Sequence, residues 1–359
     1  MISVVVPVHN VEDYVAYTVA SLLGQSSPAA EVLFIDDGST DGSRRRVERL
    51  LSGQRGTSAR LLTQPNAGVS QARNRGIDES SGEYVLFLDG DDYVHLGLMA
   101  ALECAVGTDA DIICWGFEKV RPPRSLADIP HHEVDATRHR VLEGDEILSE
   151  LLLGPLAVAI GSAAYSRRLL ETHGIRFTPG RTFGEDREFI IRAFGCATKV
   201  VVLEPILAYW VDRGESATNT YDLSRFQAIE AHASAFTFLE EQPGSSMQDV
   251  AAAHRGRVIR GHYFHNLNRC VVLKTSHRSN ILHEIEAAYP GLNGRILQDL
   301  RSNPPARFSQ KLFMRSWTLY WVHALVTARV IRPELGHRSA ILASVGAVTC
   351  GDAVAWCFV

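Results

Sequence analysis

Residues 1–120 alternate short apolar segments with segments of helical spacing, and this alternation limits the possible fold more than any other feature. The apolar segments have the length and composition of buried strands and cover residues 2–8, 31–35, 60–63, 83–88 and 111–117. Helical patterns lie between them, at residues 11–23, 69–80 and 96–105. The alternation predicts an α/β domain with a mostly parallel sheet and helices on both faces.

Polar clusters follow three of the predicted strands. They are His9-Asn10, Asp36-Asp37 and Asp89-Gly90-Asp91-Asp92. A solvated turn would explain one such cluster, because Asp and Gly are common in turns. Three clusters at the carboxyl ends of strands instead predict a ligand site, since open α/β sheets bind ligands there. Oxygen-rich clusters with few protein ligands suit Mg²⁺ or Mn²⁺, which complete their shells with water and substrate phosphate.

Composition places the chain among globular proteins. It has 359 residues, 46% hydrophobic and 21% charged, which is enough for two domains or for one domain with an extension. A net charge of −5 does not indicate a general nucleic-acid binder. Six cysteines without a C-x-x-C pair argue against zinc and against a disulfide framework, and they suit a reducing cytoplasm. Residues 2–6 predict a core strand rather than a signal peptide.

The pattern changes after about residue 221, where glycines become rare and long helical patterns begin. These patterns cover residues 223–241, 247–274, 280–288, 294–301 and 309–330. We therefore predict a first domain of residues 1–220 and a helical region of residues 221–359. Before this boundary, the proline-rich segment 121–139 predicts a loop, and its His131-His132 pair has no other candidate metal ligands nearby.

Five motifs in order resemble one known family. They are Val4-Val5-Val6-Pro7-Val8-His9-Asn10, Ile35-Asp36-Asp37-Gly38-Ser39-Thr40-Asp41-Gly42-Ser43, Asn66-Ala67-Gly68-Val69-Ser70-Gln71-Ala72-Arg73-Asn74, Leu88-Asp89-Gly90-Asp91-Asp92 and Gly184-Glu185-Asp186. Their order and spacing resemble the inverting family-two glycosyltransferases of GT-A type, over about residues 2–216. The resemblance implies a GT-A fold, followed here by the C-terminal helical region. It also implies metal-dependent transfer of a sugar from a nucleotide diphosphate to a hydroxyl, with inversion at the anomeric carbon.

The resemblance also implies which partners and residues take part. The donor it implies is a UDP-sugar, and the acceptor is a saccharide, a lipid-linked saccharide or a small molecule, as in capsule or cell-wall polysaccharide synthesis. The nucleotide-binding residues that it implies are Pro7, His9, Asn10, Asp37, Asn66, Gly68, Arg73, Asp89, Arg213 and Ser216. Arg73 has two open roles, contact with the base or support of the acidic turn. Trp210 differs from the residues that family members usually carry just before the loop of Arg213 and Ser216.

Carboxylates supply the metal and catalytic residues in this interpretation. Asp91 is the firmest ligand for Mn²⁺ or Mg²⁺, while Asp89 binds either the metal or the ribose. Asp92 is either a further ligand or the cap of the next helix. Inversion by single displacement needs a base within reach of the acceptor hydroxyl, and Asp186 matches the family's base. Glu185 is the alternative base, or it orients the acceptor.

Two other functions fit part of the pattern. A metal-dependent phosphatase or phosphotransferase would use the pair Asp89 and Asp91, but it leaves Asp36-Asp37, Asn66–Gly68 and Glu185-Asp186 without roles. A non-catalytic nucleotide-sugar binding protein is the second alternative, and the intact acidic positions count against it. No G-x-G-x-x-G follows the first strand, so a nicotinamide enzyme is disfavoured.

The C-terminal segment raises the question of membrane contact. Residues 311–332 combine aromatic residues with flanking Lys and Arg, which suits either a membrane surface or a buried helix of a bundle. Residues 339–359 are apolar over a membrane-spanning length, but Asp352 and several Gly and Ser residues favour packing or peripheral association. We therefore predict a cytoplasmic protein with possible peripheral contact to the inner face of the membrane, and homo-oligomerisation stays open.

Overall fold

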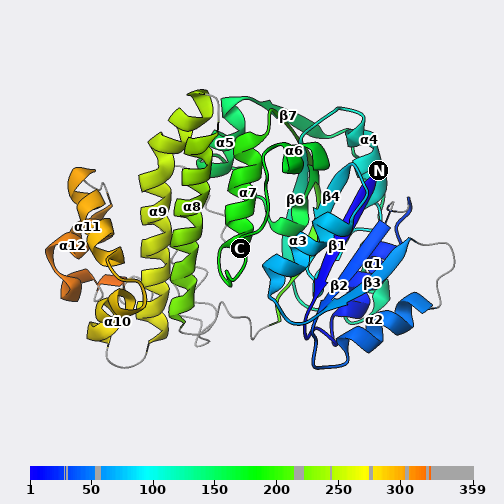
Figure 1. Ribbon diagram of the computed structural model, residues 1–359, viewed down its shortest axis with the longest axis horizontal. Helices are drawn as coiled ribbons and strands as arrows, with labels where there is room; N and C mark the ends of the chain where they lie inside the picture. Colours follow the sequence, from blue (N-terminus) through cyan, green and yellow to red (C-terminus); the bar gives the residue numbers. More distant parts are fainter. Residues whose placement is uncertain are drawn as a thin grey trace.

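The computed structural model describes residues 1–324, with gaps at 28, 30, 53–57, 214–221, 243–244, 275–277, 304–306 and 321–322. Within these residues the chain forms one mixed sheet that is flanked by helices and followed by a helical region (Figure 1). The candidate site residue Ser216 and the apolar segment 339–359 lie outside the described residues.

The sheet has nine strands among the described residues. They are β1 (Ile2–Val8), β2 (Glu31–Asp37), β3 (Ala59–Gln64), β4 (Tyr84–Phe87), β5 (Tyr93–Val94), β6 (Ile112–Val120), β7 (His139–Glu143), β8 (Ala163–Ser166) and β9 (Lys199–Val211). Their spatial order is β3-β2-β1-β4-β8-β6-β9-β5, and β7 also pairs with β9. The first four strands in this order are parallel, so β1, β2 and β4 end at the same edge.

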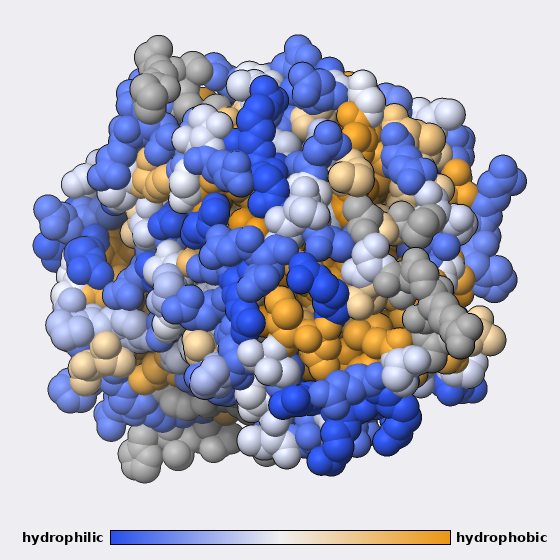
Figure 2. Space-filling model, turned by 45° about the vertical axis from the view of Figure 1, so that its right-hand side comes forward, coloured by the Kyte–Doolittle hydropathy of each residue, from blue (hydrophilic) through white to orange (hydrophobic). Residues whose placement is uncertain are grey.

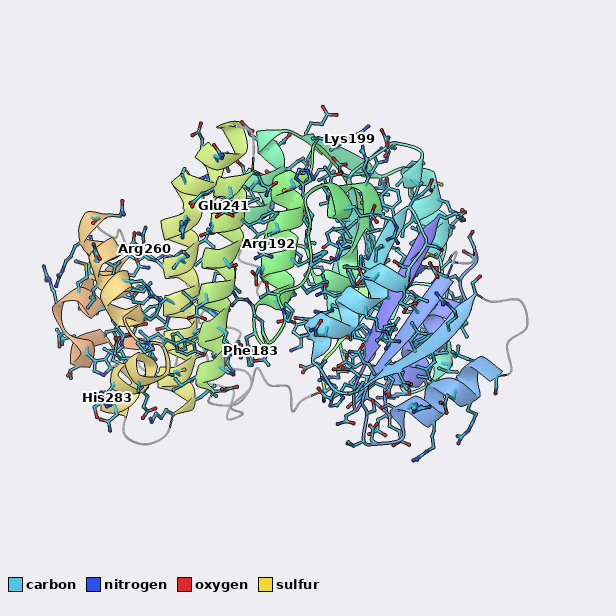
Figure 3. The ribbon with its side chains drawn as sticks, in the orientation of Figure 1. Phe183, Arg192, Lys199, Glu241, Arg260 and His283 are labelled. Carbon is cyan, nitrogen blue, oxygen red and sulfur yellow. The ribbon has the colours of Figure 1, made fainter. Side chains whose placement is uncertain are left out.

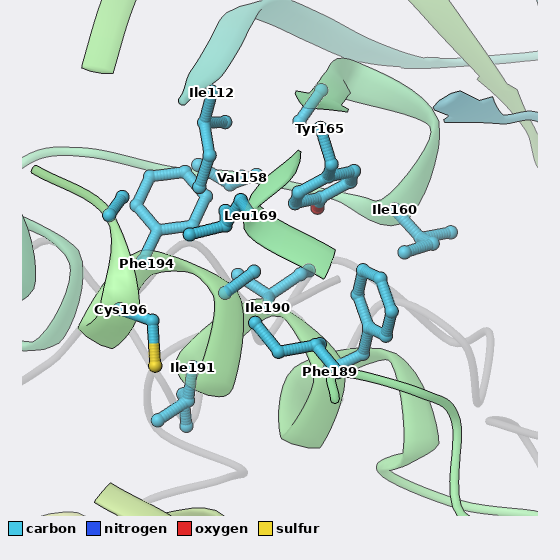
Figure 4. Close-up of a cluster of buried hydrophobic side chains, with 14 of the residues drawn as sticks. Ile112, Val158, Ile160, Tyr165, Leu169, Phe189, Ile190, Ile191, Phe194 and Cys196 are labelled. Carbon is cyan, nitrogen blue, oxygen red and sulfur yellow. The ribbon is translucent and has the colours of Figure 1, made fainter. Parts of the chain in front are cut away.

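Helices cover both faces of the sheet, as the alternation predicts. One face packs on α1 (Val15–Leu23), α2 (Ser43–Ser52) and α4 (Leu98–Val106). The other packs on α3 (Val69–Glu79), α5 (Asp145–Leu152), α6 (Arg167–Thr172) and α7 (Glu185–Cys196). Figure 4 shows part of this second core, in which Phe189 and Phe194 of α7 lie among side chains of the sheet and α6. These two buried cores fix the position of the edge where β1, β2 and β4 end relative to the start of α7.

The sheet is mixed rather than parallel throughout. β8 is antiparallel to both β4 and β6, and β9 is antiparallel to β5 and β7 while parallel to β6. The regular alternation ends after β6, because residues 121–138 contain only a short 3₁₀ turn and no crossover helix before β7. Strands that are not joined by such a crossover can pair in the antiparallel direction.

Two predicted helices differ in extent, and one long strand follows the predicted alternation. That strand is β9, whose irregularity around Pro205 faces Gly116 of β6. The helix predicted from residue 11 begins at Val15, because residues 11–14 form turns. The helix predicted at 309–330 is described as α12 (Phe308–Arg315), and the chain continues in a separate helical turn after Ser316.

The C-terminal helices lie beside α7 rather than apart from the sheet domain. α8 (Gln227–Glu241) packs on α7, and the long helix α9 (Ser245–Leu273) packs on α8, so that the three run side by side (Figure 1). Figure 3 labels Arg192 on α7 and Arg260 on α9, the two outer helices of this layer. Apolar residues of α8 and α9 belong to the same buried core as α7; they include Phe236, Leu239 and Val258.

A third core holds the end of the described chain. It joins α9 to α10 (Ile281–Ala288), α11 (Leu292–Ser302) and α12, and it buries Phe313 and Tyr320. The described aromatic residues of the segment predicted for a membrane surface or a bundle, Phe313, Trp317 and Tyr320, are thus buried or partly buried in this core. Among the described residues, no helix has the length and apolar character needed to cross a membrane. Figure 2 shows one face of the molecule, largely hydrophilic, with hydrophobic residues gathered in one area bordered by hydrophilic ones.

Candidate active site

The acidic turn of residues 89–92 follows directly after β4. The backbone N–H of Asp92 donates to the carbonyl oxygen of Asp89 at 3.0 Å and closes the turn. A Cβ at Gly90 would lie 2.8 Å from the carbonyl oxygen of Pro7, so the turn can approach β1 only with glycine at this position. The carboxylates therefore lie beside the end of β1, next to the candidate nucleotide residues.

The Asp91 carboxylate lies 2.9 Å from Nε of Arg213, just after β9. Burial and repulsion from Asp89 raise the pKa of Asp91. The structure thus brings together three residues that the sequence places in the metal and phosphate site. A divalent cation would relieve the repulsion between the two carboxylates.

Asp92 connects the turn to the sheet. Its Oδ1 accepts a hydrogen bond from the backbone N–H of Val211 at 2.9 Å, at the end of β9. The cap of α4 is Gly97, so Asp92 does not cap the next helix, one of the two roles predicted for it. Burial and repulsion from Asp91 raise the pKa of Asp92 well above its usual value. Asp92 therefore holds the last residue of β9 beside the acidic turn.

Arg73 of α3 links the two acidic motifs. Its guanidinium donates to Asp89 Oδ1 at 2.6 Å and to Glu185 Oε1 at 3.3 Å, and it lies 5.1 Å from the ring centroid of Phe177. Burial alone would lower the pKa of Arg73, but Asp89 and Glu185 outweigh it and the pKa is raised. Of its two predicted roles, the structure shows the support of the acidic turn. Residues separated by more than a hundred positions in the chain are thereby held together.

Glu185 and Asp186 form the first turn of α7. Gly184 precedes them with a φ of 83°, and a Cβ there would lie 2.7 Å from Cα of Ala228 on α8. This close approach requires glycine. Burial, followed by repulsion from Asp186, raises the pKa of Glu185 to about 7. Oδ1 of Asp186 accepts a hydrogen bond from the backbone N–H of Arg187 at 2.7 Å.

Asp37 at the end of β2 organises the loop before α3. Its Oδ1 accepts from the N–H of Ala67 at 2.9 Å and from Nε2 of Gln64 at 2.8 Å, and its Oδ2 accepts from the N–H of Gly68 at 2.8 Å. A carboxylate has about four acceptor positions, so one remains for a further donor such as a base N–H. Gly68 has a φ of 87°, which positions its N–H for this contact.

His9, Asn10 and Asn66 meet at the ends of β1 and β3. Nε2 of His9 lies 3.3 Å from Nδ2 of both asparagines, and His9 Nδ1 lies 2.9 Å from the carbonyl oxygen of Asp37. Asn10 adopts a φ of 53°, a conformation that asparagine tolerates better than most residues. Its Oδ1 accepts from the N–H of Thr40 at 2.9 Å. These exposed side chains form a polar rim beside Asp37.

A cavity of about 320 Å³ lies between the acidic turn and the C-terminal helices. Among the predicted site residues, its lining includes Asp89, Glu185 and Asp186, and it also includes Asp92. The nucleotide residues of β1, β2 and the loop before α3 lie outside the lining. Asp89 therefore lies between the predicted nucleotide residues at the strand ends and a second side toward α8 and α9.

Sequence reasoning missed the residues on the second side of the cavity. They are Phe183, Arg187, Arg225, His232, His262, His265, Asn266 and Arg269. Phe183 is labelled in Figure 3, near the start of α7. His262, His265 and Arg269 recur at helical spacing and so share one face of α9. This row of polar residues, on a helix that otherwise packs in the core, was the sequence signal that could have identified the second side of the cavity.

The His131-His132 pair lies elsewhere. Nδ1 of His132 lies 3.4 Å from Nε2 of His95, and the two rings are 4.5 Å apart. Neither residue of the pair lines the cavity. Among the described residues, no group of three or more His, Cys, Asp or Glu side chains could hold a metal ion by itself. The pair gains no further ligands from the fold.

Comparison with known proteins agrees with this geometry. Solved structures share the fold: TarS 1-349 from S. aureus in complex with UDP-GlcNAc has a TM-score of 0.56 at 20% identity, covering 95% of this chain and 87% of that one. The mannosyltransferase PcManGT from Pyrobaculum calidifontis, in complex with GDP-Man and Mn²⁺, has a TM-score of 0.51 at 16% identity, covering 93% and 88%. The fold is therefore of GT-A type.

Sequence comparison finds a similar family. Residues 3–174 match the family model described as Glycosyl transferase family 2, and they contain the motifs at the ends of β1, β2 and β4. The uncharacterized glycosyltransferase EpsJ of Bacillus subtilis is 32% identical over 222 residues, which cover 61% of this chain. The match spans 63% of EpsJ, slightly less than two thirds of its length. Over these residues the chain is similar to glycosyl transferase family 2.

Proposed function

We propose that the protein transfers a sugar from a nucleoside diphosphate, with UDP-sugars as the first donors to test, to a hydroxyl of a saccharide, lipid-linked or small-molecule acceptor. The observation that carries this proposal is the arrangement around Arg73. This one guanidinium contacts both Asp89 at the strand edge and Glu185 at the start of α7. A donor held at the strand ends would thus face carboxylates that line the cavity on its other side.

The donor side suits a nucleotide. The remaining acceptor position of Asp37 can receive a base N–H, and the exposed polar groups of His9, Asn10 and Asn66 lie beside it. Arg213, which contacts Asp91, would bind the diphosphate. The bound nucleotides named for the TarS and PcManGT structures, UDP-GlcNAc and GDP-Man, support a nucleotide-sugar donor.

Asp91 and Asp89 would hold the divalent cation. Two neighbouring carboxylates without further His or Cys ligands fit Mg²⁺ or Mn²⁺, which take their remaining ligands from water and phosphate. When bound, the cation would neutralise charge on the diphosphate leaving group. The Mn²⁺ named in the PcManGT structure supports this choice of metal.

Asp186 would act as the base of a single displacement. The acceptor oxygen forms a bond to the anomeric carbon, the bond from that carbon to the phosphate oxygen breaks, and the hydroxyl proton passes to the carboxylate. Attack opposite the leaving group inverts the anomeric centre. Glu185, which is held by Arg73 and has a pKa of about 7, would orient the acceptor and is the alternative base.

The phosphotransferase alternative has less support. It would use Asp89 and Asp91 but leaves the half-buried Glu185 and its neighbour Asp186 without a role. Asp89 also contacts Arg73, which would weaken it as a nucleophile. No contact in the described structure favours that chemistry over sugar transfer.

A donor panel tests the proposal. Purified protein is incubated with UDP- and GDP-sugars, with Mn²⁺ or with EDTA, and the released nucleoside diphosphate is measured. We expect Mn²⁺-dependent release from one class of donor and no release in EDTA. Release of phosphate from simple phosphate esters, without release from any nucleotide sugar, would instead favour the phosphotransferase.

A further inference from the structure

Three partly exposed Phe and Trp side chains line the cavity beside the proposed base. They are Phe117 of β6, Phe183 just before α7 and Trp210 of β9, and we call them the cavity aromatics. The carboxylates of Asp89, Glu185 and Asp186 line the same cavity. A further wall is formed by α8, α9 and the 3₁₀ turn η4 (Leu223–Phe226). Apolar ring surfaces and hydrogen-bond acceptors therefore line one space.

The cavity aromatics differ from the buried aromatic residues of this domain. The buried ring of Phe177 stacks on that of Phe189 at a centroid distance of 4.1 Å. Tyr209, which also lines the cavity, is buried and stacks on Tyr93 at 5.1 Å. Among the described residues, no such ring pair includes a cavity aromatic. A single exposed apolar side chain is common, but several that line one cavity are typical of a ligand site.

Cations hold two of these rings in place. Nζ of Lys119 lies 4.8 Å from the ring centroid of Trp210 and 2.9 Å from Oδ2 of Asp212. Lys119 and Trp210 are also partners in the register of β6 and β9. The guanidinium of Arg225 lies 5.9 Å from the ring centroid of Phe183. Cation–π contacts of this kind are attractive, and a ring that is already held in position loses less freedom when a ligand binds.

The combination of aromatic rings and carboxylates matches the chemistry of a sugar ring. Such a ring carries C–H groups on its faces, which pack against the negative face of an aromatic ring, and hydroxyls at its rim, which donate to carboxylates. An alkyl chain would leave the carboxylates without donors, and an open-chain polyol would present no flat face to the rings. The cavity volume of about 320 Å³ is near the lower end for small-molecule sites, about 300–1,000 Å³, and suits a small ring.

We propose that the cavity aromatics bind a sugar ring of the acceptor and thereby place its reacting hydroxyl at Asp186. The proposal rests on the proposed transfer reaction, and it narrows the acceptor to one whose reacting hydroxyl belongs to a sugar ring. The aromatic side chains bind the acceptor and take no part in proton transfer. The nucleotide of the donor would remain at the strand ends, outside the cavity lining.

Saturation-transfer difference NMR tests the proposal with matched probes, in the presence of UDP and Mn²⁺. The methyl glycosides of glucose, galactose, mannose and N-acetylglucosamine are each compared with the corresponding open-chain alditol, which has hydroxyls but no ring. We expect at least one glycoside to bind about fivefold or more tightly than its alditol, the size of an aromatic contact. The C–H protons on one face of its ring should receive the strongest saturation.

Variants assign the binding to the cavity aromatics. Trp210→Ala and Phe183→Ala should each weaken the preferred glycoside about fivefold or more, whereas Trp210→Phe should retain part of the binding because it keeps an aromatic face. The matched control is Phe238→Ala, which should bind like the wild type. Phe238 is a partly exposed ring that also lies 5.1 Å from a guanidinium, that of Arg192, but it does not line the cavity. Thermal unfolding followed by circular dichroism shows that each variant is folded, and UDP binding is measured for each.

Equal binding of glycosides and alditols, no binding of any glycoside, or unchanged binding in both alanine variants would overturn the proposal. The first two results need no variant, so they stand even if a substitution prevents folding. Glycoside binding that disappears when UDP is replaced by an intact UDP-sugar that binds would assign the cavity to the donor sugar, which also overturns it. Failure of the donor panel with retained glycoside binding would refute only the transfer reaction. Active donor release with no preference for rings would refute only the acceptor proposal.

Discussion

The proposed donor side and the proposed acceptor side of this molecule are built differently. On the proposed donor side, short side chains at the strand ends form hydrogen bonds with nearby backbone groups. Asp37, for example, accepts hydrogen bonds from the backbone of the loop before α3. On the acceptor side, long side chains project from α8, α9 and η4 across a cavity. The first arrangement needs a fixed order of residues along the chain, whereas the second needs only polar residues on one helix face.

This difference explains where the family match lies. Residues 3–174 contain the donor-side motifs, and the match ends before Glu185, Asp186 and the whole of α8 and α9. A nucleoside diphosphate always presents a base, a ribose and two phosphates, so its site requires defined backbone geometry. An acceptor site on helix faces can change with single side chains while the packing underneath is kept.

Removing the proposed base should have the largest effect. Asp186→Asn is expected to lower kcat by about 10²–10⁴-fold, the usual contribution of a general base, while nucleotide binding and the thermal unfolding midpoint stay close to the wild type. Steady-state transfer assays measure the rate. The control is Asp249→Asn, an exposed carboxylate on α9. Turnover near the wild-type level in Asp186→Asn would exclude Asp186 as the base.

Breaking the connection between the two sides should cost stability. Arg73→Met leaves the carboxylates of Asp89 and Glu185 without their buried partner, and we expect the free energy of unfolding to fall by about 3–5 kcal/mol. Urea denaturation measures this change. The exposed Arg44→Met should leave the stability unchanged. A similarly small effect for Arg73→Met would show that the ion pairs contribute little to holding the site together.

The metal ligand should affect the donor side. Asp91→Asn is expected to raise the Mn²⁺ concentration for half-maximal nucleotide release by about 10–100-fold, a range seen when metal sites lose a supporting group. Asp92→Asn should change it less, because an amide oxygen can still accept from the N–H of Val211. Equal effects of the two substitutions would contradict the assignment of Asp91 as the ligand and Asp92 as a support.

A pH effect on stability should be the smallest. The pKa of Glu185 is raised to about 7 in the folded protein, so the folded state holds a proton that the unfolded state loses near pH 4.5. The stability from this group is therefore present below pH 4.5 and is lost as the pH rises through about 7. Glu185→Gln should flatten the decrease in unfolding free energy over that window. Parallel pH profiles for the wild type and the variant would contradict the raised pKa.

Much of the donor side could be predicted from the sequence because its signals are local. β1, β2 and β4 were each predicted within a few residues, and the acidic turn was placed at the correct sheet edge. The contact between Arg73 and Glu185 could not be derived from pattern alone, because it joins α3 to α7, two helices that are distant in the chain. The family resemblance identified both residues as site residues, but only the three-dimensional structure shows that they are in contact.

The acceptor side could not be predicted, for a physical reason. Arg225 and Arg269 look like surface residues of helices in the sequence, and only packing shows that they line a cavity. Asp92 illustrates the same limit, because its partner Val211 belongs to β9, a strand distant in the chain. The mixed order of the sheet was likewise hidden, since β8 and β9 pair through contacts between distant segments.

The separation of the two sides is the central claim, and one measurement tests it directly. The dissociation constant of the nucleoside diphosphate released in the donor panel is measured with Mn²⁺ for the wild type, Asp91→Asn and Arg269→Gln. We predict that binding weakens about tenfold or more in Asp91→Asn and stays at the wild-type value in Arg269→Gln. An equal loss in both variants would show that the wall of α9 binds the nucleotide, and the account of two separate sides would be wrong.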